Sequence, residues 1–162
     1  MEFWSFPPAY DKSYMPERDS KYWFPQRETL DPQTRDEHIV TRLREVMEYA
    51  YKTSPFYRGK WDDAGIRADQ IKSLEDFEKV PVVTKKELRE SQARLEPFGD
   101  YLCIPTDRVH HVHGTSGTTG QPTVFAIGRD DWETIAENQA RILWAMGLRP
   151  GDMIFIAAIF SL

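Results

Sequence analysis

Cysteine, long apolar runs and N-terminal basic residues are all scarce in this sequence of 162 residues. Its one cysteine, Cys103, has no partner for an internal disulfide and offers no zinc-binding pattern. The longest uninterrupted apolar run, Met153–Phe160, is much shorter than the roughly 20 residues that a membrane-spanning helix needs. Glu2 stands where a secretory signal would carry basic residues. These absences predict a cytoplasmic protein with no membrane partner.

An excess of positive charge is also missing. The chain has 21 Lys and Arg against 26 Asp and Glu, which gives a formal net charge of −5. A general nucleic-acid-binding protein needs a basic surface, so the composition excludes that class of partner. The hydrophobic share of 40% and the aromatic share of 13% predict a packed core and not a disordered chain.

Residues 1–30 are predicted to form an aromatic arm. The aromatic residues there have no helical or strand period, and prolines are scattered among them. We expect their rings to pin an extended segment to the body of the protein. An arm that binds a partner, including a second copy in a homodimer, is the alternative. The aromatic residues before position 25 are Phe3, Trp4, Phe6, Tyr10, Tyr14, Tyr22, Trp23 and Phe24.

A helical region is predicted over residues 31–108. Asp31 and Pro32 favour a helix start, and the following Ser54-Pro55 favours its end. Between them, apolar residues recur at helical spacing and predict one buried face. These are Ile39, Leu43, Val46, Met47 and Ala50.

Shorter elements are expected in the rest of that region. Residues 56–66 contain two glycines and are predicted to be a loop. Ser73 is expected to cap a short helix through Phe77. Thr84 and the glutamate three residues later form a capping-box pattern, which predicts another short helix to about Gln92.

Residues 109–162 change character and predict the start of an α/β subdomain. Val109–His113 and Thr123–Ile127 are predicted strands, and Asp130 with Glu133 predicts the start of a helix. One face of that helix is expected to carry Trp132, Ile135, Ala136, Gln139, Leu143 and Met146.

The apolar run Met153–Phe160 is typical of a strand buried on both faces of a sheet. A strand, a helix and a second strand form a crossover unit, so we expect the last two strands to be parallel. Such a strand needs neighbours, and we therefore expect the chain to be the N-terminal part of a longer protein. The predicted fold class is α/β: an arm and a helical region, then the start of a partly parallel sheet.

The segment Gly114–Gly120 consists only of glycine, serine and threonine. Glycines let the backbone turn sharply and bring amide N–H groups close to a ligand, while the hydroxyls add short donors. This combination favours a phosphate-binding loop. A plain hairpin connection is the alternative, although such turns usually draw on Asn, Asp and Gly.

Three better-known motifs do not fit this loop. A Walker loop requires lysine after its last glycine, where this sequence has Gln121. The dinucleotide fingerprint requires a different glycine spacing and a helix to follow. The glycines around Ser116 are one residue too close for a nucleophile elbow, which argues against Ser116 as a covalent nucleophile.

Thr115–Thr123 resembles the phosphate loop of adenylate-forming enzymes. It is most similar to that of the phenylacetate–CoA ligase family, whose usual run is Ser-Ser-Gly-Thr-Thr-Gly-x-Pro-Thr; here Thr115 replaces the first serine. Three earlier segments resemble that family in the same order, and the likeness covers roughly residues 35–162. The segments are Ser54–Arg58, Ile71–Phe77 and Pro81–Arg89.

The resemblance implies an ATP-dependent acid–CoA ligase that uses ATP, Mg²⁺ and coenzyme A. A carboxylate attacks the α-phosphorus of ATP, giving an acyl-adenylate and pyrophosphate, and the thiolate of coenzyme A then displaces AMP. The implied substrate is an aromatic carboxylic acid. The family's catalytic lysine and metal-binding glutamate lie beyond residue 162, so we expect these residues to be inactive alone. The implied ATP-phosphate ligands are Thr115, Ser116, Gly117, Thr118, Thr119, Gly120 and Thr123.

The same resemblance places Ala158 and Phe160 near the acid-binding pocket. Ala158 stands where the family often has an aromatic residue, so we expect an acid other than phenylacetate, such as a larger aryl acid.

The histidines before the loop allow two interpretations. If the strand assignment holds, His111 and His113 share a face and could bind a metal, although no third ligand is suggested by spacing. A hydrogen-bonding role for His110, His111 and His113 beside the loop is the alternative. Cys103 is expected to be a packed small residue and not a reactive thiol.

Two competing functions stand beside the acid–CoA ligase. The first is a non-catalytic dimerisation module with a vestigial loop. The second is an adenylating enzyme that passes its acyl group to a carrier-protein thiol. Residues beyond 162 would distinguish all three.

Overall fold

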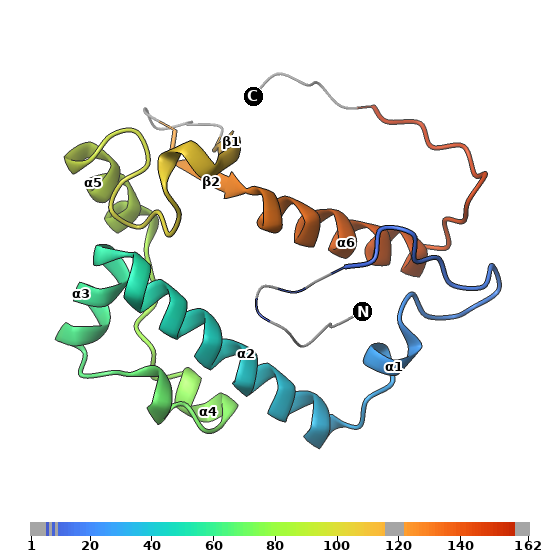
Figure 1. Cartoon of the computed structure of the whole chain (residues 1–162), viewed down its shortest axis with the longest axis horizontal. Coiled ribbons are helices and arrows are strands. Elements are labelled where there is room, and N and C mark those ends of the chain that lie inside the picture. The colour runs from blue at the N-terminus through green and yellow to red at the C-terminus, as the bar shows by residue number, and fades with distance from the viewer. Residues whose placement is uncertain (1–5, 7, 9, 116–121, 158–162) are drawn as a thin grey trace.

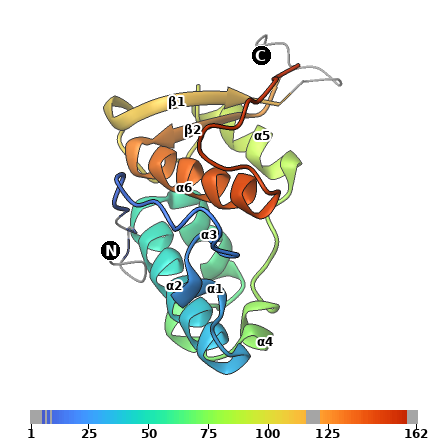
Figure 2. The ribbon, with the colours of Figure 1, turned by 90° about the vertical axis from the view of Figure 1, so that its right-hand side faces the viewer.

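The computed structural model describes residues 6, 8, 10–115 and 122–157. Two long helices, α2 (Pro32–Thr53) and α6 (Arg129–Ala145), dominate it, and a two-stranded sheet of β1 (Val109–Gly114) and β2 (Val124–Gly128) packs on α6 (Figures 1 and 2). The remaining elements are α1 (Pro25–Glu28), α3 (Pro55–Asp63), α4 (Leu74–Phe77), α5 (Lys85–Arg94) and the 3-10 turns Ala68–Gln70 and Thr106–Arg108.

Helix α2 begins and ends where its sequence predicts. The Asp31 carboxylate accepts a hydrogen bond from the amide of Thr34 at 3.0 Å, which satisfies one of the unpaired donors of the first turn. Ser54 ends the helix and at once begins α3, because its hydroxyl accepts from the amide of Tyr57 at 3.3 Å. The predicted loop over residues 56–66 is therefore wrong for residues 56–63 and holds only for 64–66. Pro55 suits the first turn of a new helix, and α3 is anchored by the buried Trp61.

The first hydrophobic cluster joins α2, α3 and the segment before α4. Met47, Ala50, Trp61 and Ile71 are buried there. Cys103 packs against this cluster, and burial raises the pKa of its thiol. The prediction that Cys103 is a packed small residue is confirmed.

The two short helices of this region begin at their predicted caps. Ser73 accepts from the amide of Asp76 at 3.2 Å and starts α4. At the start of α5, the Thr84 hydroxyl accepts from the Glu87 amide at 3.3 Å, and the Glu87 carboxylate accepts from the Thr84 amide at 2.7 Å. This reciprocal pair is the predicted capping box. Helix α5 runs to Arg94, two residues beyond the predicted end at Gln92.

The β1–β2 pair is antiparallel, with Val109 opposite Gly128 and Gly114 opposite Val124. Both strands lie within one residue of their predicted bounds. Helix α6 begins earlier than predicted, because the carboxylate of Asp131, and not that of Glu133, accepts from the amide of Gly128 at 2.9 Å.

The expected parallel strand is not present among the described residues. Residues 153–157 have no regular structure and are exposed, Met153 by 98%. A strand of the doubly buried kind forms only where neighbours satisfy its backbone and cover its faces, and no described segment does so. In the part of the chain that the structure describes, the sheet is thus antiparallel and two-stranded.

The second hydrophobic cluster fastens the arm to α6. Trp23, Phe24 and Trp144 are buried together, with Tyr14 packed against them. This confirms that aromatic rings pin the arm, although Phe3 and Trp4 lie outside the described residues. The predicted apolar face of α6 is wrong in part: Ile135 and Met146 are 45% and 71% exposed, while Trp144 faces the arm.

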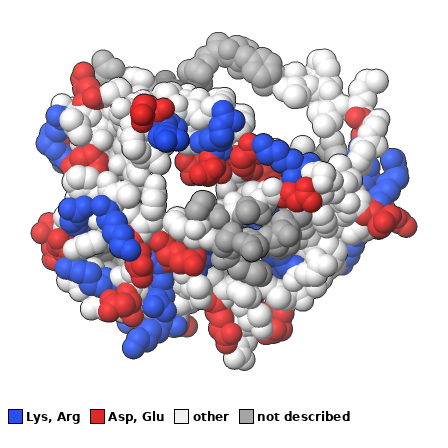
Figure 3. Space-filling view, viewed as in Figure 1, with Lys and Arg blue, Asp and Glu red and all other residues white. Residues whose placement is uncertain are grey.

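The surface carries both signs of charge side by side (Figure 3). None of the described helices is long and apolar enough to cross a membrane.

Candidate functional site

The two ends of the predicted phosphate loop are joined just beyond the Gly114–Val124 pair, at the loop end of the hairpin. The amide of Thr115 donates to the carbonyl of Thr123, and the amide of Thr123 donates to Oγ1 of Thr115, both at 3.0 Å. We call this pair the loop neck. The predicted ligands Ser116, Gly117, Thr118, Thr119 and Gly120 lie between them, outside the described residues.

Thr123 is held from a second direction. Its side chain is fully buried, and its hydroxyl accepts a hydrogen bond from Nε of Arg89 on α5 at 3.3 Å. A buried hydroxyl that lost its partner would cost free energy, so this contact favours one position of the neck.

The first residue of β2 is fastened to the same side. The amide of Val124 donates to Oε1 of Gln92 on α5 at 3.2 Å, and the hydroxyl of Tyr101 donates to the carbonyl of Val124 at 2.6 Å. Burial raises the pKa of Tyr101, so the phenol stays protonated and remains a donor at neutral pH. Helix α5 and Tyr101 together therefore fix the position of the first residue of β2. Figure 2 shows α5 beside the hairpin.

Helix α5 is itself anchored at both ends. At its start, the ammonium of Lys60 on α3 donates to Glu87, and this bond together with those from Thr84 lowers the pKa of Glu87 to about 2. In its last turns, the buried Ser91 hydroxyl accepts from the amide of Asp100 at 2.9 Å.

The turn after α5 requires a glycine. Gly99 has a φ of +74°, and a Cβ there would lie 2.9 Å from the ring of Tyr101. Any other residue would be strained in conformation and would also push Tyr101 away from Val124.

The histidines of β1 lie beside Trp132 of α6. The ring of His111 stacks on Trp132 with centroids 3.9 Å apart, and His113 lies 6.3 Å from His111. Partial desolvation, with the Arg129 guanidinium nearby, lowers the pKa of His110. No group of three or more His, Cys, Asp or Glu that could hold a metal ion occurs among residues 10–115 and 122–157.

A large open cavity lies away from the loop neck. It has a volume of about 1090 Å³ and lies between α2, the arm and the far end of the hairpin, where Val109 pairs with Gly128. The predicted acid-pocket residues Ala158 and Phe160 lie outside the described residues, so neither is placed relative to this cavity.

Sequence reasoning missed three side chains that hold the neck and the residue after it: Arg89, Gln92 and Tyr101. Arg89 ends one of the segments that resemble the phenylacetate–CoA ligase family, so its place in that segment was a signal. Nothing in the spacing of Gln92 or Tyr101 points to Val124, because these contacts span 32 and 23 positions.

Comparison with known proteins gives matches along almost the whole chain, although no family model matches it. Over 138 residues it is 37% identical to the phenylacetate-coenzyme A ligase of Thermus thermophilus, covering 85% of this chain and 30% of that protein. It is 38% identical over 121 residues to the phenylacetate-coenzyme A ligase of Escherichia coli, covering 75% and 26% respectively.

Solved structures of 2-hydroxyisobutyryl-CoA ligase show the same fold. One, in complex with 2-HIB-AMP and CoA in the thioesterification state, superposes with a TM-score of 0.94 at 58% identity and covers all of this chain and 34% of that one. Another, in the postadenylation state with 2-HIB-AMP, has a TM-score of 0.92 at 56% identity over 99% of this chain and 34% of that one.

The chain thus spans 26% to 34% of the length of these relatives. The identities and the shared fold confirm the predicted resemblance. This chain belongs to the phenylacetate–CoA ligase family of adenylate-forming CoA ligases.

Proposed function

We propose that this chain is part of an AMP-forming acid–CoA ligase, and that its loop holds the phosphates of ATP during adenylation. The observation that carries the proposal is the hydrogen-bonded neck of Thr115 and Thr123, since the sequence between them includes five successive small hydroxyl and glycine residues, 116–120. Relatives solved with an acyl-adenylate and CoA support both half-reactions.

In the first half-reaction the acid carboxylate attacks the α-phosphorus of ATP and pyrophosphate leaves. Negative charge develops on the departing phosphates, and donors aimed at that charge lower the barrier. Hydroxyls of Ser116, Thr118 and Thr119 and amides of Gly117 and Gly120 are the donors that we assign to this task. In the second half-reaction the thiolate of coenzyme A attacks the acyl carbon, forming the thioester and releasing AMP.

Magnesium enters this proposal with the nucleotide. The described residues contain no cluster that would hold the ion by itself. Mg²⁺ in phosphoryl-transfer sites is bound largely through substrate phosphates, so the residues present are compatible with that arrangement. When bound, the ion supplies positive charge to the phosphate oxygens.

The identities favour a small acid over the aromatic acid expected from the sequence. Identity to 2-hydroxyisobutyryl-CoA ligase reaches 58%, whereas it is 37% and 38% to the two phenylacetate-coenzyme A ligases above. We therefore propose a short branched 2-hydroxy acid as the substrate, with an aryl acid as the competing class.

Acid-dependent exchange of labelled pyrophosphate into ATP by the complete polypeptide tests the proposal. The panel is 2-hydroxyisobutyrate, isobutyrate (which lacks the hydroxyl), phenylacetate and a larger aryl acid. We expect the highest kcat/KM with 2-hydroxyisobutyrate, followed by CoA-dependent release of AMP. A higher kcat/KM with an aryl acid would overturn the proposed substrate, and absence of exchange with every acid would overturn the proposed function.

A further inference from the structure

We propose that Arg89 is a positioning residue for adenylation, acting through the buried hydroxyl of Thr123. The inference rests on the proposed function, since it assigns how the neck of the ATP loop is held. It concerns only described residues: the donor on α5, the acceptor at the neck, and the contacts that fix both.

The geometry makes Thr123 a link and not an exposed ligand. Its side chain has no exposed surface, its amide and carbonyl both bond to Thr115, and its hydroxyl accepts from Arg89 at 3.3 Å. The sequence predicted Thr123 as one of the ATP-phosphate ligands. A hydroxyl already engaged in a buried contact is better suited to hold the loop in place than to bind a phosphate.

The other contacts of α5 make Arg89 a rigid anchor. Two residues earlier, Glu87 bonds to Thr84 and Lys60, and three residues later Gln92 bonds to the amide of Val124. The helix therefore contacts two successive residues, Thr123 of the neck and Val124 at the start of β2. Small displacements of donors lower their effect on a transition state strongly, which makes the position of the neck matter for catalysis.

The loop itself carries no lysine or arginine. Arg89 brings a guanidinium to the neck, and two explanations of its effect must be separated: its charge, or its directed Nε–H bond to Thr123. Lysine keeps the charge and lacks the planar donor group, so Arg89→Lys separates them.

The test uses the complete polypeptide and measures both half-reactions. Adenylation is followed by pyrophosphate exchange, and thioester formation by adding CoA to pre-formed acyl-adenylate. We expect Thr123→Val and Arg89→Gln each to lower exchange about tenfold, the effect of 1.36 kcal/mol on a barrier. We expect thioester formation to change less than twofold. Thr123→Ser, which keeps the hydroxyl, should restore exchange.

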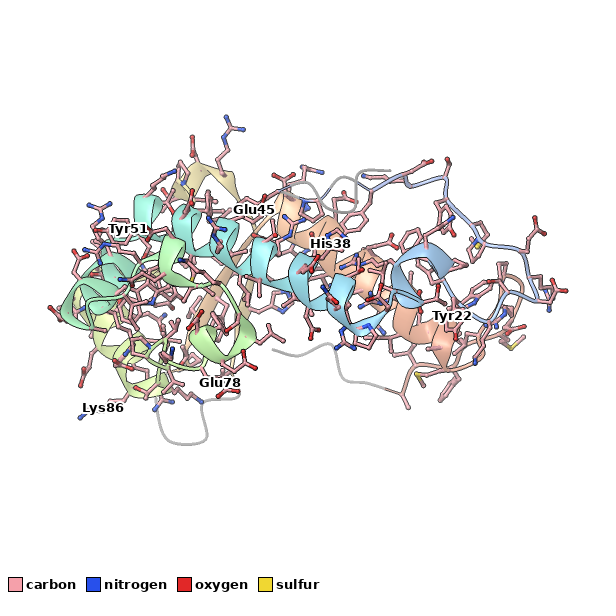
Figure 4. All side chains as sticks on the ribbon, turned by 90° about the horizontal axis from the view of Figure 1, so that it is seen from below. Tyr22, His38, Glu45, Tyr51, Glu78 and Lys86 are labelled. Atoms are coloured by element: carbon pink, nitrogen blue, oxygen red, sulfur yellow. The ribbon has the colours of Figure 1, made fainter. Side chains whose placement is uncertain are left out.

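Coupling between the two residues is the decisive readout. If Arg89 acts through Thr123, Arg89→Gln should lower exchange little further in a Thr123→Val background, because the shared contact is already lost. Arg89→Lys should not restore pyrophosphate exchange. The matched control is Lys86→Gln, which removes one positive charge from the exposed face of the same helix, where Lys86 extends away from the body (Figure 4). It should leave both rates unchanged.

Several outcomes would overturn the inference while leaving the proposed function intact. These are full exchange by Thr123→Val, full rescue by Arg89→Lys, additive losses in the double variant, or equal loss of both half-reactions. Should Arg89→Gln fail to fold, as judged by its thermal transition, the Thr123→Val and Thr123→Ser pair decides alone. If the wild type shows no exchange with any acid, the proposed function fails. The Kd for ATP with Mg²⁺ then tests whether the Thr123 hydroxyl positions the loop. Equal Kd values for Thr123→Val and Thr123→Ser would overturn the inference.

Discussion

The indole rings of Trp23 and Trp144 meet edge to face with centroids 5.4 Å apart, although one lies in the N-terminal arm and the other in the last turn of α6. Nε1 of Trp144 donates to the carbonyl of Ser20 at 3.0 Å, and the Arg149 guanidinium lies 3.8 Å above the Trp144 ring. Buried aromatic pairs of this geometry stabilise beyond the area that they bury. Residues 14–24 of the arm are therefore part of the fold.

Loss of Trp144 should destabilise the protein strongly. Trp144→Ala removes the ring from the second cluster and leaves a cavity, so we expect the free energy of unfolding to fall by about 3–5 kcal/mol. Trp144→Phe should recover part of that loss. Denaturant unfolding of the purified protein measures both, with Met146→Ala on the exposed side of the chain as control. A loss of less than about 1 kcal/mol would show that the arm is dispensable.

The capping box of α5 should contribute to stability locally. Thr84→Ala removes the hydroxyl that accepts from the Glu87 amide, and we expect a loss of about 1 kcal/mol. Thr84→Ser keeps the acceptor and should be close to wild type. Chemical denaturation distinguishes the two; equal stability of the alanine and serine variants would contradict the cap.

Glu87 should give a pH-dependent contribution to stability. Its pKa is lowered from 4.5 to about 2, mainly by Lys60, so the folded state favours the ionised form. The contribution is present above about pH 4.5 and is lost as the pH falls toward 2. We therefore expect the difference in Tm between wild type and Glu87→Gln to be largest near pH 7 and to vanish between about pH 4.5 and 2. A difference that stays constant over this range would contradict the ion pair with Lys60.

The hydroxyl of Tyr101 should contribute more to stability than the hydroxyl of an exposed tyrosine. Tyr101→Phe removes the donor to the Val124 carbonyl, and we expect a loss of about 1 kcal/mol. Tyr51→Phe is the matched control, because the Tyr51 hydroxyl bonds to Asp62 near solvent, and it should cost less. Thermal unfolding of both variants compares them, and equal losses would show that the Val124 contact has no special weight.

The loop threonines should control adenylation. In the complete polypeptide, Thr118→Ala and Thr119→Ala should each slow pyrophosphate exchange about tenfold or more, because each removes a donor assigned to the departing phosphates. Thr118→Ser and Thr119→Ser keep the hydroxyl and should retain most of the rate. An unchanged exchange rate in both alanine variants would remove these residues from the site.

Local signals in the sequence determined most of the helix starts. Asp31, Ser73 and Thr84 cap the helices that follow them, because a cap is satisfied by amides two or three residues ahead and needs no distant partner. The error at α6 is also local: Asp130 with Glu133 predicted the start, whereas Gly128 is the N-cap and its amide donates to the carboxylate of Asp131.

The caps of α2, α4 and α5, the composition of the loop and the family could thus be read from the sequence. Tertiary structure alone decided that Arg89 reaches Thr123, that Trp23 reaches Trp144, and that residues 153–157 lack the neighbours that a buried strand needs. The physical reason is distance along the chain. Contacts between remote residues depend on how whole helices pack, and no short-range pattern of residue types specifies that packing.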